Sequence, residues 1–172
     1  VIATQSGTLR DNFNDNNVDG WEEITVPLNK KVPFKDWQVI DGELHIADQQ
    51  DNVVRCLVVG KSKWKNYVLE VDVKPIQALG KNDINLVARF KDNRSFVCTI
   101  GNWTGTPKVI AFQALWVGAV ANNQKQQPFD LLKVGKWHHL KLKAEEDDFT
   151  IWINDRKMMN YQDPTLQKGQ VG

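Results

Sequence analysis

The sequence has little cysteine, no long apolar run and no excess of charge of either sign. Its 172 residues include 2 cysteines, 22 basic residues and 21 acidic residues, so the formal net charge is +1. No apolar run reaches the roughly 20 residues that a transmembrane helix needs. The balanced charge also removes the attraction on which nucleic-acid binding depends. We therefore expect no membrane span and no nucleic-acid partner, and a neutral polar ligand remains open.

The cysteine spacing and the absence of common catalytic motifs further limit the kinds of site that the chain is expected to form. Cys56 and Cys98 form neither a CxxC motif nor a zinc-ligand spacing. A disulfide between neighbouring strands and two buried free thiols both fit, since free cysteine behaves as a small hydrophobe. A nucleophile elbow, an HExxH motif and a phosphate loop are also missing. The start at Val1 has no initiator Met and no signal peptide, as expected of a mature terminus or a module excised from a secreted protein.

Alternation of apolar and polar residues is the dominant pattern, and it is densest over residues 64–103. From Tyr67 to Lys74 the period is two, as in a half-buried strand. Asp41-Gly42 and the polar residues 91–94 predict hairpin connections, and residues 145–148 predict an acidic hairpin tip. Residues 121–130, rich in Asn and Gln, are interpreted as an exposed loop. The pattern predicts one all-β domain over residues 1–172, a two-sheet antiparallel β-sandwich.

Several segments together resemble the concanavalin A-like jelly roll, in its laminin-G-like and DUF1080 branch. They are LRDNFNDNNVDGW, WQVIDGELHI, WKNYVLEVDVKP, INLVARF, GKWHHLKLKAEEDDFTIWIND and the closing GQVG. The branch includes carbohydrate-binding modules and domains attached to glycoside hydrolases. The resemblance implies a non-catalytic carbohydrate-binding domain of a secreted or cell-surface, multimodular protein that acts on polysaccharides. Because the family usually continues with another strand after Gly-x-x-Gly, it also implies a chain that runs on past Gly172 or an open edge.

Carbohydrate binding requires aromatic faces for the C–H surface of the sugar and planar polar groups for its hydroxyls. Trp37, Trp64 and Trp137 each open a predicted strand and are expected to cover sheet ends. We predict a ligand-binding set on two other tryptophans, Trp103 and Trp116, and on polar residues whose faces could be continuous: Glu70, Asp72, Asn85, Arg89 and Asn102. Arg89 matches an Arg that commonly ends this strand in the resembled family, and its fork of donors suits vicinal hydroxyls. The alternative for Arg89 is a surface ion pair with Asp72.

Two other functions remain open. Glu70-Val71-Asp72 matches the start of the E-x-D-x-x-E signature of retaining jelly-roll glucanases, which suggests a glycoside hydrolase-type enzyme of the same fold. Lys74 stands where the second carboxylate of the catalytic pair would be needed, so no catalytic residue is assigned. A zinc site is not expected either, because His138 and His139 point to opposite faces of a strand. The third function is a laminin-G-like adhesion domain that binds protein through an exposed apolar patch.

A structural calcium ion is the cofactor that the sequence suggests. The loop of residues 14–20 is dense in turn formers, and the nearby oxygen ligands would come from Asp11, Asp15 and Asp19. A solvated turn is the alternative, because the spacing is not that of the twelve-residue calcium loop.

Overall fold

The computed structural model describes residues 2–4, 8–26, 30–32, 37–46, 54–76, 84–92, 94–103, 106–116, 119–130 and 132–172. Within these segments the secondary structure is β-strand, and the strands pair antiparallel. No described segment forms a helix that could cross a membrane. The predicted all-β sandwich is therefore confirmed.

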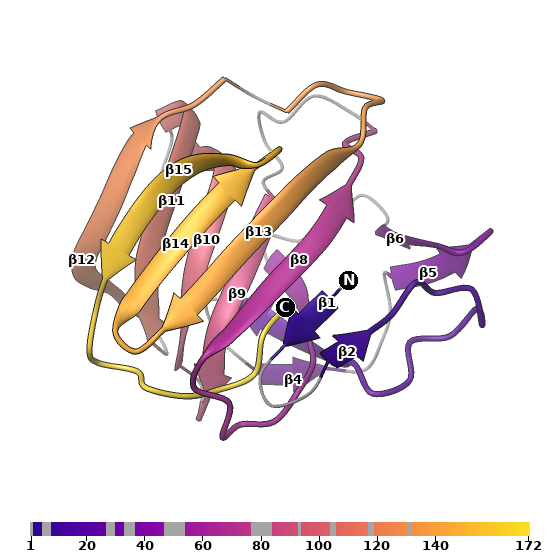
Figure 1. Cartoon of the computed structure of the whole chain (residues 1–172), viewed down its shortest axis with the longest axis horizontal. Helices are drawn as coiled ribbons and strands as arrows, with labels where there is room; N and C mark the ends of the chain where they lie inside the picture. Colours follow the sequence, from indigo (N-terminus) through magenta and orange to yellow (C-terminus); the bar gives the residue numbers. More distant parts are fainter. Residues whose placement is uncertain are drawn as a thin grey trace.

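The strands form two facing layers (Figure 1). The first sheet has the order β15 (Arg156–Gln162), β14 (Asp148–Ile153), β13 (His138–Glu145), β8 (Tyr67–Val73), β1 (Ile2–Thr4) and β2 (Thr8–Arg10). The second sheet has the order β12 (Ala119–Pro128), β11 (Thr106–Trp116), β10 (Arg94–Trp103) and β9 (Ile84–Lys91). Smaller sheets are β4 (Lys30–Val32), β3 (Glu22–Val26) and β7 (Val54–Val58), and the hairpin of β5 (Trp37–Ile40) and β6 (Glu43–Ile46).

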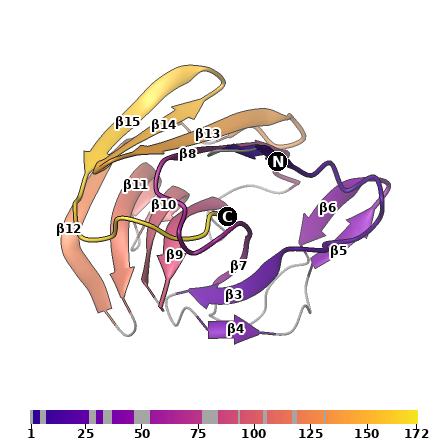
Figure 2. The same cartoon turned by 60° about the horizontal axis from the view of Figure 1, so that its bottom comes forward.

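The GQVG segment, residues 169–172, lies between β7 and β9. On one side Val171 and Val59 exchange backbone hydrogen bonds of 3.1 and 2.7 Å. On the other side the backbone N–H groups of Gln170 and Phe90 each donate to the other's carbonyl at 2.9 Å. This segment joins the β4-β3-β7 sheet to the second sheet, and Figure 2 shows the resulting curved layer beneath the first sheet.

The core between the layers is built by the inward residues of the alternating strands. Its centre is an aromatic cluster in which the ring centroids of Phe96 and Phe149 are 4.6 Å apart and those of Phe112 and Tyr161 are 4.8 Å apart. Burying each such side chain stabilises the fold by about 1.5–3 kcal/mol. The rings come from both sheets, so this cluster fixes the sheets against each other.

Both cysteines are buried free thiols, which decides between the two possibilities that the sequence left open. Cys98 belongs to the core between the layers. Cys56 belongs to a second apolar cluster with Ile24, Val58 and other residues of the curved layer. Burial raises the pKa of the Cys56 thiol to about 12, with a smaller contribution from the charge of Glu23.

The predicted hairpins are present, but one predicted loop is a strand. Asp41 and Gly42 have φ of 51° and 75° between β5 and β6, and Glu146 with φ of 49° turns β13 into β14. The interpretation of residues 121–130 as an exposed loop was wrong, because β12 covers Ala119–Pro128. An edge strand pairs through its backbone, so β12 forms against β11 although its side chains are largely polar.

Candidate functional site

The predicted ligand residues do not share one face. Glu70 and Asp72 lie on β8 in the first sheet, whereas Asn85 and Arg89 lie on β9 in the second sheet. The expectation of a continuous polar face was therefore wrong. Whether a strand joins the first or the second sheet depends on contacts between residues distant in sequence, and the alternation of apolar and polar residues does not predict these contacts.

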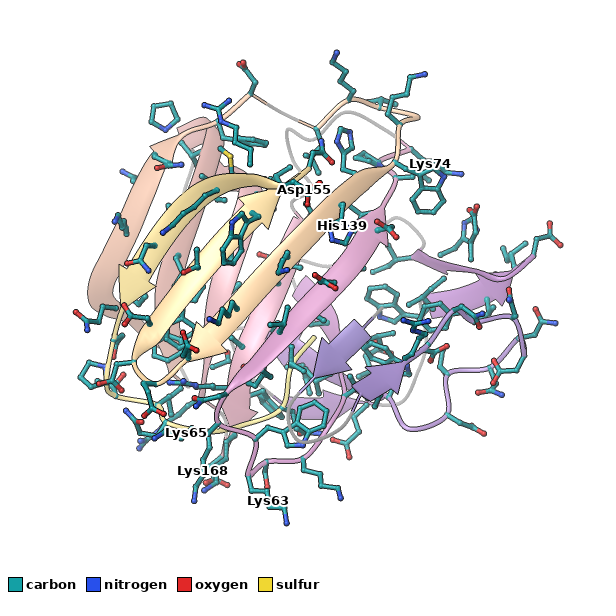
Figure 3. The ribbon with its side chains drawn as sticks, in the orientation of Figure 1. Lys63, Lys65, Lys74, His139, Asp155 and Lys168 are labelled. Carbon is teal, nitrogen blue, oxygen red and sulfur yellow. The ribbon has the colours of Figure 1, made fainter. Side chains whose placement is uncertain are left out.

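Glu70 and Asp72 stand on the outer face of the first sheet, which is the face turned away from the second sheet. Asp72 Oδ1 is 2.9 Å from His139 Nδ1, and Glu70 Oε1 is 2.9 Å from Lys141 Nζ. Figure 3 shows His139 projecting from this face. The neighbouring His138 is buried and contacts the backbone N–H of Lys133 at 3.0 Å, so the two histidines point to opposite faces as predicted. Each carboxylate is thus already matched with a basic side chain.

Arg89 lies in the interior, where its side chain is 0% exposed. Its guanidinium donates to the backbone carbonyls of Leu166 at 2.5 Å, Lys65 at 3.3 Å and Glu146. The guanidinium also lies 4.6 Å from the centre of the Phe149 ring. The predicted surface pair with Asp72 is absent, and the contacts that are present tie β9 to three chain segments.

Burial lowers the pKa of the Arg89 guanidinium, and the charges of Tyr67, Asp147 and Glu146 oppose this shift. The backbone at Arg89 has φ of 53°, where the register of β9 against β10 changes by one residue. The Arg89 N–H donates to the Tyr67 hydroxyl at 2.8 Å across the core. These contacts make Arg89 a structural connection between the two sheets.

The outer face of the second sheet carries a row of directly paired residues, one from each strand. The pairs are Asn85 with Thr99, Thr99 with Ala111, and Ala111 with Gln126. We call these four residues the polar row. The Thr99 hydroxyl donates to Asn85 Oδ1 at 2.7 Å, which orients the amide. Asn85 is partly exposed and Gln126 is exposed, so the row reaches solvent at both ends.

Beside the polar row lie polar atoms that have no partner. Gln113 occupies the same outer face, two residues along β11 from Ala111, and pairs with Val97 and Gln124. Its Oε1 is buried without a hydrogen bond, and so is the Oγ of Ser95 on β10. A buried acceptor or hydroxyl without a partner costs about 1–3 kcal/mol. Such atoms are expected where a ligand or an ordered water completes the hydrogen bonding.

Sequence reasoning identified Asn85 but missed Thr99, Ala111, Gln113 and Gln126 as its neighbours. The sequence did contain a signal for Thr99 and Gln113. Both residues alternate with core residues along their strands, so they must face away from the core. The pairing of Thr99 with Asn85 could not be predicted, since it depends on the register shift near Arg89.

The tryptophan predictions have mixed outcomes. Trp37 and Trp64 pack against the core as expected, whereas Trp137 is 53% exposed, so the expectation that it covers a sheet end was wrong. Asn102 and Trp103 end β10, and Trp116 ends β11. Their side chains lie outside the described parts of the chain, so their ligand role stays a prediction.

Two of the three suggested calcium ligands, Asp11 and Asp15, accept hydrogen bonds from nearby residues. Asp11 accepts hydrogen bonds from the Phe13 N–H at 2.8 Å and the Trp21 indole N–H at 2.7 Å, and Asp15 accepts from the Asn17 N–H at 3.3 Å. Among the described residues no three His, Cys, Asp or Glu gather to hold a metal ion. Structural calcium through Asp11, Asp15 and Asp19 stays a prediction, and a melting temperature unchanged by a chelator would contradict it.

Comparison with solved structures shows the same fold in carbohydrate-active and galectin-like proteins. The carbohydrate-binding module CBM66 from Bacillus subtilis is 19% identical with a TM-score of 0.62, and the match covers 91% of this chain and 87% of that one. A laminarinase from Flavobacterium sp. UMI-01 is 11% identical with a TM-score of 0.60, covering 94% and 83%. A galectin-like protein of unknown function from Bacillus subtilis is 11% identical with a TM-score of 0.59, covering 88% and 80%. At these identities the likeness concerns the fold alone.

The sequence itself identifies the family. No curated protein matches it. The family described as the 3-keto-alpha-glucoside-1,2-lyase-like domain matches residues 8–172, which is nearly the whole chain and includes every strand except β1. This chain therefore belongs to the family of 3-keto-alpha-glucoside-1,2-lyase-like domains.

Proposed function

We propose that the domain binds a neutral saccharide on the outer face of the second sheet, in a secreted or cell-surface protein that carries further modules. The observation that carries the proposal is the polar row Asn85, Thr99, Ala111 and Gln126, in which two side-chain amides and one hydroxyl lie in register on three of the four strands. Family membership supports the ligand class, since the family's name describes an activity on a glucoside. Detection of the full-length protein only in cell lysate, never in medium or on the surface, would contradict the location.

The chemistry of the polar row suits hydroxyl groups. Asn85 uses its Oδ1 to accept a hydrogen bond from Thr99, which leaves its amide N–H groups as the donors for a ligand. Ala111 lies between Thr99 and Gln126, and both Ala111 and Thr99 are buried, at 1% and 3% exposure. The groups of the row that solvent reaches are therefore Asn85 and Gln126 at its two ends. Because sugar hydroxyls both donate and accept, they match the donors of Asn85 and Gln126 and the unpartnered Oε1 of Gln113.

A matched pair of valine substitutions tests this proposal. Thr99→Val removes the hydroxyl that orients Asn85 and keeps the shape of the side chain. Thr150→Val is the control, because Thr150 forms a comparable pair with Asn160 on the first sheet, at 3.3 Å. Calorimetric titration with a panel of gluco-oligosaccharides should show about fivefold weaker binding for Thr99→Val, as the loss of about 1 kcal/mol implies. Equal affinities of the two variants and the wild type would contradict the proposal.

The second candidate function is catalysis, favoured by the family's description as lyase-like and by the pair of His139 and Asp72. In a 3-keto glucoside the proton on carbon 2 is acidic, because it is adjacent to the carbonyl. A base at His139 would take that proton, the electrons would form the C1–C2 double bond, and the glycosidic oxygen would leave from C1 as an alcohol after protonation. Asp72 would hold the imidazole in position at 2.9 Å.

Product release from disaccharides oxidised at carbon 3 tests this candidate. Turnover by the wild type that is strongly reduced in His139→Gln would support it, and Glu70→Gln tests whether the neighbouring carboxylate contributes. No turnover by the folded wild type on any such disaccharide would leave saccharide binding as the function.

A further inference from the structure

Exposed apolar side chains gather where the chain leaves β8 and where it enters β13. Ile76, three residues beyond the end of β8, is 71% exposed, Val134 is 50% exposed and Trp137 is 53% exposed. Ile76 and Val134 are neighbours of the Pro75 carbonyl and the Gly135 N–H, which form a hydrogen bond of 2.8 Å. Large apolar groups in water are costly, so a cluster of them indicates a binding surface.

Polar groups hold this cluster in place. Lys74 Nζ lies 4.7 Å from the centre of the Trp137 ring and 3.4 Å from Glu43 Oε2 on β6. His45 Nε2 is 3.6 Å from the same carboxylate oxygen. Figure 3 shows Lys74 where β8 ends close to the β5–β6 hairpin. We call Glu43, Lys74, Ile76, Val134 and Trp137 the Trp137 surface, and it is assembled from three separate chain segments.

We propose that the Trp137 surface is a second saccharide-binding site, at which a sugar ring stacks on the indole of Trp137. Lys74 lies over one face of the ring, so the sugar stacks on the opposite face. Glu43 accepts hydrogen bonds from sugar hydroxyls, and Ile76 and Val134 contact the apolar edge of the sugar. The choice of ligand class rests on the proposed function, but the location rests on these contacts alone.

The charges of the Trp137 surface favour a neutral ligand over an ionic one. Lys74 and Glu43 compensate each other at 3.4 Å, and both side chains are about one third exposed, at 30% and 38%. The pair therefore offers donors and an acceptor without net charge, which suits hydroxyl groups. Lys74 already contacts one face of the indole before binding, which reduces the conformational entropy that is lost when a sugar stacks on the other face.

An array of plant, bacterial and fungal polysaccharides and of mucin glycans tests the site, with deglycosylated proteins included as separate spots. Trp137→Ala should weaken glycan binding about tenfold, and Trp137→Phe should retain most of it because an aromatic face remains. Trp152→Ala is the matched control, since Trp152 on the first sheet also lies beside a lysine, with Lys141 Nζ 5.7 Å from its ring. Unchanged melting temperatures would exclude misfolding as the cause.

Thr99→Val is measured on the same array, so that the Trp137 surface and the polar row are tested separately. A loss in Trp137→Ala with unchanged binding by Trp152→Ala supports the Trp137 surface. A loss confined to Thr99→Val overturns it and leaves the polar row as the binding site. Binding to deglycosylated protein that depends on Trp137 overturns the saccharide in favour of a protein partner. Absence of glycan binding by the wild type overturns both sites.

Discussion

Replacing Arg89 separates a structural role from a ligand role. Arg89→Ala would leave the carbonyls of Leu166, Lys65 and Glu146 without the guanidinium that now donates to all of them. It would also remove the contact of the guanidinium with the Phe149 ring. A hydrogen bond from a charged donor contributes about 1.5–3 kcal/mol, and an interior carbonyl left without a donor costs about 1–3 kcal/mol.

The hydrogen-bond contribution and the cost of the unpaired carbonyls cannot simply be added, because both include the loss of solvent around the same groups. We therefore expect Arg89→Ala to lower the free energy of unfolding by about 3–5 kcal/mol, near the upper end for single substitutions. For a domain of this size that corresponds to a fall in melting temperature of about 6–20 °C. Arg89→Lys should recover only part of the stability, since an ammonium cannot reproduce the planar fork of donors.

The assay is urea denaturation followed by tryptophan fluorescence, with saccharide binding measured on the same samples under native conditions. The expected result is a large loss of stability with unchanged affinity in the fraction that stays folded. Stability within about 1 kcal/mol of the wild type, together with lost saccharide binding, would refute the structural role and restore Arg89 as a ligand residue.

Three further substitutions or conditions test other parts of the account. Gly169→Ala would place a Cβ 2.2 Å from the Arg89 carbonyl carbon, so in a melting experiment it should destabilise the fold by about 3 kcal/mol. Gly135→Ala is the control, because nothing lies within 4 Å of its Cβ. Its φ of +70° should cost only about 1 kcal/mol. Gln113→Met removes an unpartnered buried oxygen and should stabilise the fold by about 1–2 kcal/mol while weakening saccharide binding; destabilisation would contradict this. The pKa of Cys56 rises from 9.0 to about 12 on folding, so between pH 9 and 12 the native state holds a proton that the unfolded state has lost. This thiol should therefore lower the free energy of unfolding by about 1.4 kcal/mol per pH unit in that range. If the free energy of unfolding of Cys56→Ala depended on pH as strongly as that of the wild type, this prediction would be contradicted.

Local chemistry made much of the fold predictable. Asp41-Gly42 suits the left-handed conformation that a tight hairpin requires, and the strands around it alternate in the usual way. The strand from Tyr67 is visible in the sequence because one side packs on the core and the other faces water. β12 could not be predicted, because its residues are largely polar. An edge strand forms by backbone pairing with a neighbouring strand and does not require alternating apolar residues.

The candidate site was less predictable because it depends on register and sheet membership. The hairpin pairs Lys91 with Arg94, but after the irregularity near Arg89 the partner of Ala88 is Phe96, a shift of one residue. A shift of one residue exchanges the two faces of a strand. Without this register shift Asn85 would not lie opposite Thr99, and no local sequence pattern indicates the shift.

The most direct test of saccharide binding on the second sheet is amide chemical-shift mapping by NMR during titration with a gluco-oligosaccharide that the domain binds. The account predicts saturable shifts at Asn85, Thr99, Ala111 and Gln126 on the four strands of the second sheet. It predicts little change for β13 and β14 in the first sheet. Shifts confined to the outer face of the first sheet, around His139 and Lys141, would contradict the account.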